Sequence, residues 1–221
     1  MSETFDSSED RFSVNCVRCS RLAEFLATSR VRFPEYYGHP VPAFGDNNPA
    51  SLIVGLAPGM HGANATGRPF TGDHAGVLLY ATLYKFGFSN RPSSISRTDG
   101  LRLIDCKITN AVRCVPPQNK PKSDEVNNCL DYLRSDLEQV RLGGVVVALG
   151  RVAHEAVLKA LNLSSQKFKF GHGNLFSIKC NKLNLLSSYH CSRYNTQTRR
   201  LTVEMFEDVF ENARNIVDGM P

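Results

Sequence analysis

Four apolar runs of strand length are spread along the chain, at residues 51–57, 103–112, 144–150 and 183–189. Short continuous apolar runs of this kind predict strands that are buried on both faces. Apolar residues at helical spacing predict helices between and after these runs, at 77–86, 123–141, 151–161 and 201–217. Strands that alternate with helices predict a three-layer α/β fold, with a central, mostly parallel four-stranded sheet flanked by helices.

A Gly-rich segment follows the first predicted strand and runs from Gly55 to Asp73. It therefore lies at the carboxyl end of a strand, where open α/β sheets bind their ligands. A loop of this length is uncommon in a compact domain unless it has a function. It is not a phosphate-binding loop of the Walker type, because no Lys lies between Ala50 and Tyr84. Its glycines also lack the spacing of the dinucleotide-binding fingerprint.

Two further polar segments follow later strands of the predicted sheet. Residues 110–121 read Asn-Ala-Val-Arg-Cys-Val-Pro-Pro-Gln-Asn-Lys-Pro, and residues 188–202 read Ser-Tyr-His-Cys-Ser-Arg-Tyr-Asn-Thr-Gln-Thr-Arg-Arg-Leu-Thr. The carboxyl ends of parallel strands share one edge of a sheet, so the pattern predicts that these segments and the Gly-rich segment meet at one site.

Seven cysteines, an odd number, argue against a disulfide scaffold. Four of them form a Cys-x2-Cys pair and a wider Cys-x14-Cys pair: Cys16, Cys19, Cys114 and Cys129. Four thiolates suit either tetrahedral zinc or an iron–sulfur cluster, and the spacing alone does not choose between them. The wide second pair favours iron–sulfur. The other three, Cys106, Cys180 and Cys191, lie in or beside apolar runs and are predicted to be small core residues.

Length and composition predict an ordinary globular protein. We expect one domain over residues 12–221, preceded by a disordered acidic tail at residues 1–11. No apolar run approaches the roughly 18–20 residues of a membrane span, and the start carries no apolar signal region. We therefore expect a cytoplasmic protein, associated with the nucleoid if the source is prokaryotic.

The net charge is +5 despite the acidic start. Basic residues gather in three places, two of them in or beside the polar segments: Arg193, Arg199 and Arg200; Arg113, Lys120 and Lys122; Lys167 and Lys169. Positive charge near a candidate site favours a polyanion such as DNA as the partner.

With its flanks, the Gly-rich segment resembles the type 5 uracil-DNA glycosylases, an iron–sulfur branch of that superfamily. The resemblance includes residues 36–46, which read Tyr-Tyr-Gly-His-Pro-Val-Pro-Ala-Phe-Gly-Asp, and both polar segments described above. It extends from about Cys16 to Val217. The chain departs from the family pattern where Tyr37, Ala65 and Arg199 replace a usual Trp, Arg and Gly, which affects fine contacts to DNA.

The resemblance implies a uracil-DNA glycosylase-like fold with a [4Fe-4S] cluster on the four paired cysteines, in a structural role. It implies a monomeric, monofunctional enzyme that removes uracil, and hypoxanthine as a second deaminated base, from double-stranded DNA at the start of base excision repair. Two alternatives stay open: a non-catalytic iron–sulfur module that binds damaged DNA, and a zinc-stabilised nucleotide-binding protein.

A glycosylase flips the target base into a pocket that needs an aromatic floor and hydrogen bonds to the base edge. Phe70 is the candidate floor, and Gly59 lets the backbone approach the base. Asn110 and Asn119 are both candidates for reading the base edge, because an amide donates and accepts at once. By resemblance, His190 donates to the base as negative charge develops.

The water-activating group is the open question, because the chain lacks the acid that related branches carry near Gly59. Asp73 is the nearest remaining carboxylate, and it is also a natural N-cap for the following helix. His61 and Asn64 are further candidates. A polar loop is predicted to grip phosphates and fill the gap left by the flipped base, through Ser192, Arg193, Asn195, Thr196 and Gln197. His172 is a weaker candidate that is expected to contact backbone.

Overall fold

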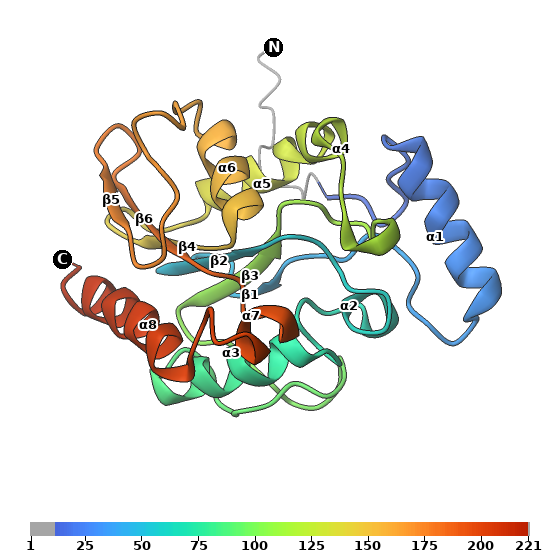
Figure 1. Cartoon of the computed structure of the whole chain (residues 1–221), viewed down its shortest axis with the longest axis horizontal. Helices are drawn as coiled ribbons and strands as arrows, with labels where there is room; N and C mark the ends of the chain where they lie inside the picture. The colour runs from blue at the N-terminus through green and yellow to red at the C-terminus, as the bar shows by residue number, and fades with distance from the viewer. Residues whose placement is uncertain (1–11, 221) are drawn as a thin grey trace, which may run out of the picture.

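The computed structural model describes residues 12–220, and the predicted tail at residues 1–11 lies outside this range. It contains one six-stranded sheet in the order β1-β3-β2-β4-β6-β5 (Figure 1). The four central strands are parallel and coincide with the predicted ones: β3 (Cys106–Asn110), β2 (Ser51–Gly55), β4 (Val145–Leu149) and β6 (Leu183–Ser188). The predicted α/β class and parallel centre are confirmed.

The sheet is wider than predicted, because an antiparallel strand is added at each edge. β1 (Phe44–Gly45) pairs with β3, and β5 (Leu175–Ile178) pairs with β6. Neither has a continuous apolar run: β1 has two residues, and β5 is exposed along most of its length. The predicted count of four strands therefore describes the buried centre only.

Helices cover both faces of the sheet (Figure 1). On one face lie α4 (Ser123–Asn128), α5 (Leu130–Glu138) and α6 (Arg151–Ala160), and on the other lie α3 (His74–Lys85) and α8 (Val203–Asp218). The predicted helix over 123–141 is two helices that meet at Cys129. The remaining helices are α1 (Ser20–Arg32), α2 (Ala63–Thr66), the 3-10 turn η1 (Pro117–Asn119) and α7 (Arg193–Gln197).

Alternating residues of the central strands supply the two halves of the core. In β2, Leu52 and Val54 pack with the layer of α4, α5 and α6, whereas Ile53 packs with the layer of α3 and α8. Both faces of the parallel strands are thus removed from water, which accounts for the continuous apolar sequences of β2 and β4. Among the described residues, no helix combines the length and the apolar character needed to cross a membrane.

Candidate active site

A cavity of about 470 Å3 lies at the carboxyl edge of the parallel strands. The loops after β2, β3, β4 and β6 all contribute to its wall, as the strand order predicts. Its polar and aromatic lining includes Phe70, Asp73, Asn110, Asn119, Arg151, His190, Ser192 and Arg193. The Gly-rich segment and both polar segments predicted to converge are therefore brought together.

Phe70 is held against the end of β2 by two glycines. It is 6% exposed and adopts a positive φ of 54°, which is uncommon outside glycine. A Cβ atom at Gly55 would lie 2.7 Å from Phe70 Cζ, and one at Gly76 would collide with the Phe70 carbonyl oxygen. Only glycine at both positions lets the phenyl ring line the cavity in this conformation.

Asn110 ends β3 and its side chain lies beside Phe70. It is 3% exposed, and its amide group makes no hydrogen bond to any residue in the described part of the chain. Asn119 also lines the cavity, but it is exposed and adopts a positive φ of 57° on the η1 turn. Asn110 therefore presents its amide to the cavity from the end of a strand, whereas Asn119 lies on an exposed turn.

His190 follows β6 and faces the same cavity as Phe70. The two rings stack with centroids 5.9 Å apart and planes 26° apart. Burial lowers the pKa of His190 to about 4, so the imidazole is neutral near pH 7. Its backbone is anchored because Asn195 Nδ2 donates to the His190 carbonyl oxygen at 2.8 Å. A neutral imidazole in this place can donate one hydrogen bond into the cavity.

Asp73 is the N-cap of α3, and Oδ1 accepts from the Gly76 N–H at 2.9 Å. The second oxygen, Oδ2, lies toward the Gly-rich loop, where a Cβ atom at Gly59 would be 3.7 Å away. Burial raises the pKa of Asp73, while the backbone hydrogen bonds from Gly76 and Ala75 oppose that rise. The predicted N-cap is therefore confirmed, and Asp73 also lines the cavity.

His61 and Asn64 are not brought to the cavity. The Asn64 amide points toward α1, where Nδ2 donates to Ser29 Oγ at 3.1 Å. His61 is exposed, and its Nδ1 lies 2.9 Å from the Tyr36 hydroxyl. In this segment it is Gly62 that packs closely against Asp73, where a Cβ atom would lie 2.7 Å from Oδ2. Neither His61 nor Asn64 lines the cavity.

The predicted phosphate-gripping loop forms a short helix at the rim of the cavity. Ser192 is the N-cap of α7 and lines the cavity together with the exposed Arg193. Gln197 is exposed, whereas Thr196 Oγ1 lies 3.4 Å from His74 Nε2 of α3. Asn195 is used to hold the His190 backbone. Of the five residues, Ser192 and Arg193 face the cavity and Gln197 faces solvent, whereas Asn195 and Thr196 contact neighbouring parts of the protein.

Arg151 lines the cavity and was missed by the sequence interpretation. It is the first residue of α6 and follows Gly150, whose φ is +97°. Its guanidinium lies 5.3 Å from the centroid of the Phe170 ring. The signal was available, because Arg151 comes directly after a buried parallel strand, at the edge where ligands bind.

The four paired cysteines gather on the α4–α5 side of the molecule. Cys114 and Cys129 are buried, and Cys16 and Cys19 pack against the same apolar cluster. Burial raises the pKa of the Cys114 thiol, and the neighbouring thiols Cys129, Cys16 and Cys19 raise it further. All the cysteines are free thiols. Within residues 12–220, however, no three His, Cys, Asp or Glu side chains form a group ready to hold a metal ion.

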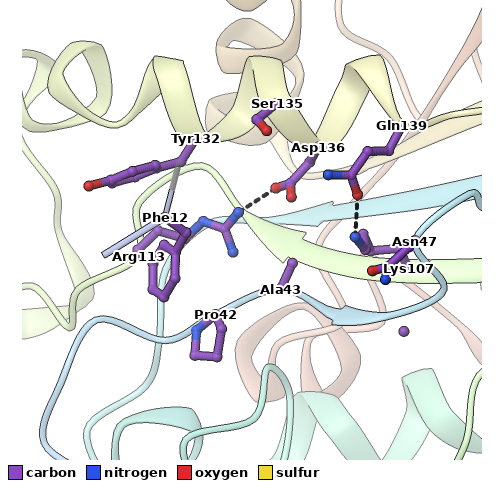
Figure 2. A pocket seen from close by; sticks show the side chains of 11 residues that line it. Phe12, Pro42, Ala43, Asn47, Lys107, Arg113, Tyr132, Ser135, Asp136 and Gln139 are labelled. Carbon is purple, nitrogen blue, oxygen red and sulfur yellow. Dashed lines mark hydrogen bonds and ion pairs between the residues drawn. The ribbon is translucent and has the colours of Figure 1, made fainter. Parts of the chain in front are cut away.

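A second, smaller cavity of about 120 Å3 is lined by Arg113, the residue before Cys114, and by Tyr132 and Asp136 of α5 (Figure 2). Figure 2 shows Arg113, which is 2% exposed and precedes Cys114, pointing toward Asp136 of α5, with which it forms a buried ion pair. Thr109 Oγ1 donates to the same carboxylate at 2.7 Å. The Arg113 guanidinium and backbone N–H both lower the pKa of Cys129, partly offsetting its burial. This network joins the strand that carries Asn110 to the cysteine region.

The other cysteines follow the prediction in part. Cys106 and Cys191 are fully buried in the core on the α3–α8 side. Cys180 is exposed in the turn between β5 and β6, so its predicted place in the core is wrong. An apolar neighbourhood in sequence did not imply burial there, because β5 lies at the sheet edge.

The fold and the cavity define a class of proteins. Residues 42–214 match the model of the uracil DNA glycosylase superfamily, and the chain belongs to this superfamily. It is 44% identical over 204 residues to a type-5 uracil-DNA glycosylase of Pyrobaculum aerophilum, covering 90% of this chain and 88% of that protein. A type-5 uracil-DNA glycosylase of Thermus thermophilus is 43% identical over 206 residues, covering 91% and 93%.

A type-4 uracil-DNA glycosylase of Archaeoglobus fulgidus is more distant, at 32% identity over 153 residues, covering 68% of this chain and 69% of that protein. The resemblance to the type 5 branch that the three motifs indicated is thereby confirmed. The superfamily match at residues 42–214 includes every loop that lines the cavity.

Proposed function

We propose that the protein is a DNA repair glycosylase that hydrolyses the N-glycosidic bond between uracil and deoxyribose. The observation that carries the proposal is that Phe70, Asn110, Asp73 and His190 line one cavity of about 470 Å3. An aromatic surface, an amide, a carboxylate and a neutral imidazole are the groups that this hydrolysis requires. The type-5 relatives, which act on uracil in DNA by name, support the same reaction.

Substrate binding begins when the target nucleotide leaves the base stack, because its glycosidic bond is inaccessible within the duplex. The uracil ring stacks on Phe70, and the Asn110 amide pairs with the polar edge of the base. Arg193 and Arg151 place positive charge at the rim, where it favours the flanking phosphates. Ser192, at the start of α7, contributes a further donor to the same phosphates.

Bond cleavage moves negative charge onto the base and positive charge onto the sugar. His190 donates its N–H to the base carbonyl as this charge develops, which is the kind of preorganised contact that lowers a barrier most. Asp73 positions the attacking water through Oδ2, while Oδ1 stays bonded to Gly76. The raised pKa of Asp73 brings it closer to the range of an effective general base.

We further propose activity on double-stranded DNA, on hypoxanthine as well as uracil, and without a lyase step. Gly59 stands where related branches carry an acid, and this leaves room for a larger base beside Asp73. Among the described residues that line the cavity there is no lysine to form a Schiff base with the sugar. The protein acts as a monomer in this proposal.

The four gathered cysteines are proposed to hold a [4Fe-4S] cluster with a structural role. Four iron atoms space their cysteine sulfurs more widely than one zinc ion does, since zinc needs four sulfurs at about 2.3 Å. The other three thiols are close enough to affect the pKa of Cys114. Among the described residues the four do not form a site for a single metal ion, and this wider spacing is compatible with a four-iron cluster. Cys16 and Cys19 would hold the cluster from the N-terminal segment, Cys114 from the loop after β3 and Cys129 from the junction of α4 and α5.

The test is to incubate the purified protein with duplexes that contain one uracil or one hypoxanthine, followed by alkali, which breaks the strand at abasic sites. Strand breaks at the damaged position only after alkali support a monofunctional glycosylase. Tight binding to the uracil duplex without breaks would instead identify a non-catalytic damage-binding module. Breaks without alkali would contradict the absence of a lyase step.

A further inference from the structure

His172 lies outside the cavity, but it contacts the backbone directly before His190. Its Nδ1 accepts a hydrogen bond from the Tyr189 N–H at 3.1 Å. The rings of His172 and Tyr189 stack, with centroids 5.0 Å apart and planes 20° apart. Arg200 lies over the Tyr189 ring, 4.7 Å from its centroid. The residue before His190 is therefore fixed through both its backbone and its side chain.

The imidazole of His172 continues the hydrogen bonding of β6 beyond the point where β5 can supply it. Within the turn at residues 171–174, Gly173 N–H donates to the Ser187 carbonyl at 2.8 Å and Ser187 N–H donates to the Asn174 carbonyl at 2.9 Å. Two residues further along the chain, toward the cavity, the Tyr189 N–H would be the next donor of this ladder. Its hydrogen bond is accepted by the His172 side chain instead of a backbone carbonyl. Across the described residues, this is the bond that ends the ladder next to the cavity.

The second ring nitrogen of His172 is also engaged. Burial lowers the pKa of His172, and a hydrogen bond to the backbone of Met205, in the first turn of α8, partly opposes this lowering. Donation from Nε2 and acceptance at Nδ1 together require one neutral tautomer. His172 thus bridges α8 to the end of β6 in a single orientation.

We propose that His172 is a positioning residue for His190, acting through the hydrogen bond that it accepts from the Tyr189 N–H. The proposal rests on the function proposed above, in which His190 donates to the departing base. Tyr189 precedes His190, so a rotation of its peptide would move the imidazole away from the Phe70 face. Asn195 holds the His190 carbonyl on the other side, and the two bonds together fix the direction in which His190 points.

Two substitutions separate the Tyr189 contact from the Met205 contact. In His172→Asn, the amide oxygen occupies the place of Nδ1 and can still accept from Tyr189. In His172→Gln, the longer side chain places its amide near the position of Nε2 and can still donate to Met205, but the Tyr189 N–H loses its acceptor. The variants lose one hydrogen bond each, so their stabilities are expected to be similar. His172→Ala loses both.

The measurement is single-turnover release of uracil from a duplex, together with KM and the thermal midpoint of each variant. We expect His172→Gln to lose at least about tenfold in kcat with little change in KM, since a misplacement of about 1 Å can cost about 100-fold. His172→Asn is expected to stay within about threefold of wild type. Equal losses in both variants, or no loss in His172→Gln, would overturn the proposal.

Amide hydrogen exchange keeps the proposal testable if a variant fails to fold. In the wild-type protein the Tyr189 N–H is expected to exchange slowly, as its bond to His172 requires, and fast exchange there would refute the proposal by itself. An inactive wild-type enzyme would point instead to a failure of the glycosylase function. The two failures are therefore distinguishable.

Discussion

At Asp73, one carboxylate oxygen caps α3 and the other faces the Gly-rich loop, and substitution can separate the two roles. Asn is as good an N-cap as Asp, whereas Ala costs about 1 kcal/mol at such a position. We expect Asp73→Asn to keep the stability of the wild type and Asp73→Ala to lose about 1 kcal/mol. Both are expected to lose about 100-fold or more in single-turnover rate while still binding uracil DNA.

Thermal midpoints and band-shift titrations measure the cap and the binding, and quenched-flow assays measure the rate. An Asp73→Asn enzyme with a wild-type rate would show that the carboxylate does not activate the water. A loss confined to Asp73→Ala would mean that capping, rather than base catalysis, accounts for the effect.

His190 links the site to stability at acid pH. Burial lowers its pKa from 6.5 to about 4 in the folded state. Between these values the unfolded chain binds a proton that the folded protein does not, so stability is complete above pH 6.5 and falls as the pH drops toward 4. The expected loss from this group is about 3 kcal/mol.

The measurement is the free energy of unfolding from pH 7 to pH 4 for the wild type and His190→Gln. The other titrating groups, such as His154 and His172, are present in both proteins and cancel in the comparison. The wild type is expected to lose more stability than the variant over this range. Parallel curves would contradict the lowered pKa of His190.

Single residues also show what the sequence could not determine. The motif pattern placed Phe70, Asp73, Asn110 and His190 at one edge, and the structure brings all four to one cavity. The direction of each side chain was beyond reach, because it depends on local backbone rotation. Asn64 turns toward Ser29 within a helix of four residues, and Asn119 lies exposed on a positive-φ turn while Asn110 is buried.

At the scale of elements, α3 contains a glycine where helix propensity alone would favour alanine. At an exposed position inside a helix, replacing Gly with Ala stabilises a protein by about 1 kcal/mol. Here the added Cβ would collide with the Phe70 carbonyl oxygen. We expect Gly76→Ala to destabilise the protein and to reduce uracil release, because Phe70 must move from the cavity wall.

Val77→Ala is the matched control, since Val77 is the next residue of the same helix and is 70% exposed. It is expected to be close to wild type in the thermal midpoint and in the rate of uracil release. If Gly76→Ala behaved like this control, the close approach of α3 to Phe70 would not be needed for activity.

The elements divide by how their sequences relate to burial. The four central strands were predictable because they are buried on both faces, so that β2 and β4 are almost entirely apolar and β3 and β6 lie within longer, largely apolar runs. The edge strands were not, since two residues of β1 and the exposed β5 carry no such signal. Helix α7 is short and polar, so its sequence predicts a loop. The break between α4 and α5 at Cys129 was not predictable either, because the helical spacing of apolar residues runs on through it.

At the scale of the whole molecule, a chain of buried hydrogen bonds and one ion pair links the proposed catalytic side chains to the cysteine quartet. Asn110 follows Thr109, whose hydroxyl donates to Asp136, and Asp136 pairs with Arg113 beside Cys114. Breaking a buried ion pair by removing one partner is strongly destabilising. The catalytic edge and the cysteine region are therefore parts of one structural unit rather than separate modules.

This arrangement predicts that losing the quartet destabilises the whole molecule. Cys114→Ser removes a proposed cluster ligand, and metal-ligand binding energy contributes directly to folding energy. We expect the variant to contain less than the about four irons per chain of a loaded protein. We also expect a loss of the broad blue absorbance and of at least about 3 kcal/mol of stability, a thermal shift of roughly 6–12 °C.

Cys106→Ser is the matched control, because it places the same hydroxyl at a fully buried position outside the quartet. It is expected to keep its iron and colour and to lose only the cost of burying that hydroxyl, about 1–3 kcal/mol. If both variants kept the colour, Cys114 would be excluded as a cluster ligand. A wild type that held zinc instead of iron would exclude the cluster. A Cys114→Ser protein that lost its colour yet matched Cys106→Ser in stability would show that the cluster is dispensable for the fold, because the core between α5 and the sheet would then suffice to hold β3 and the cavity in place.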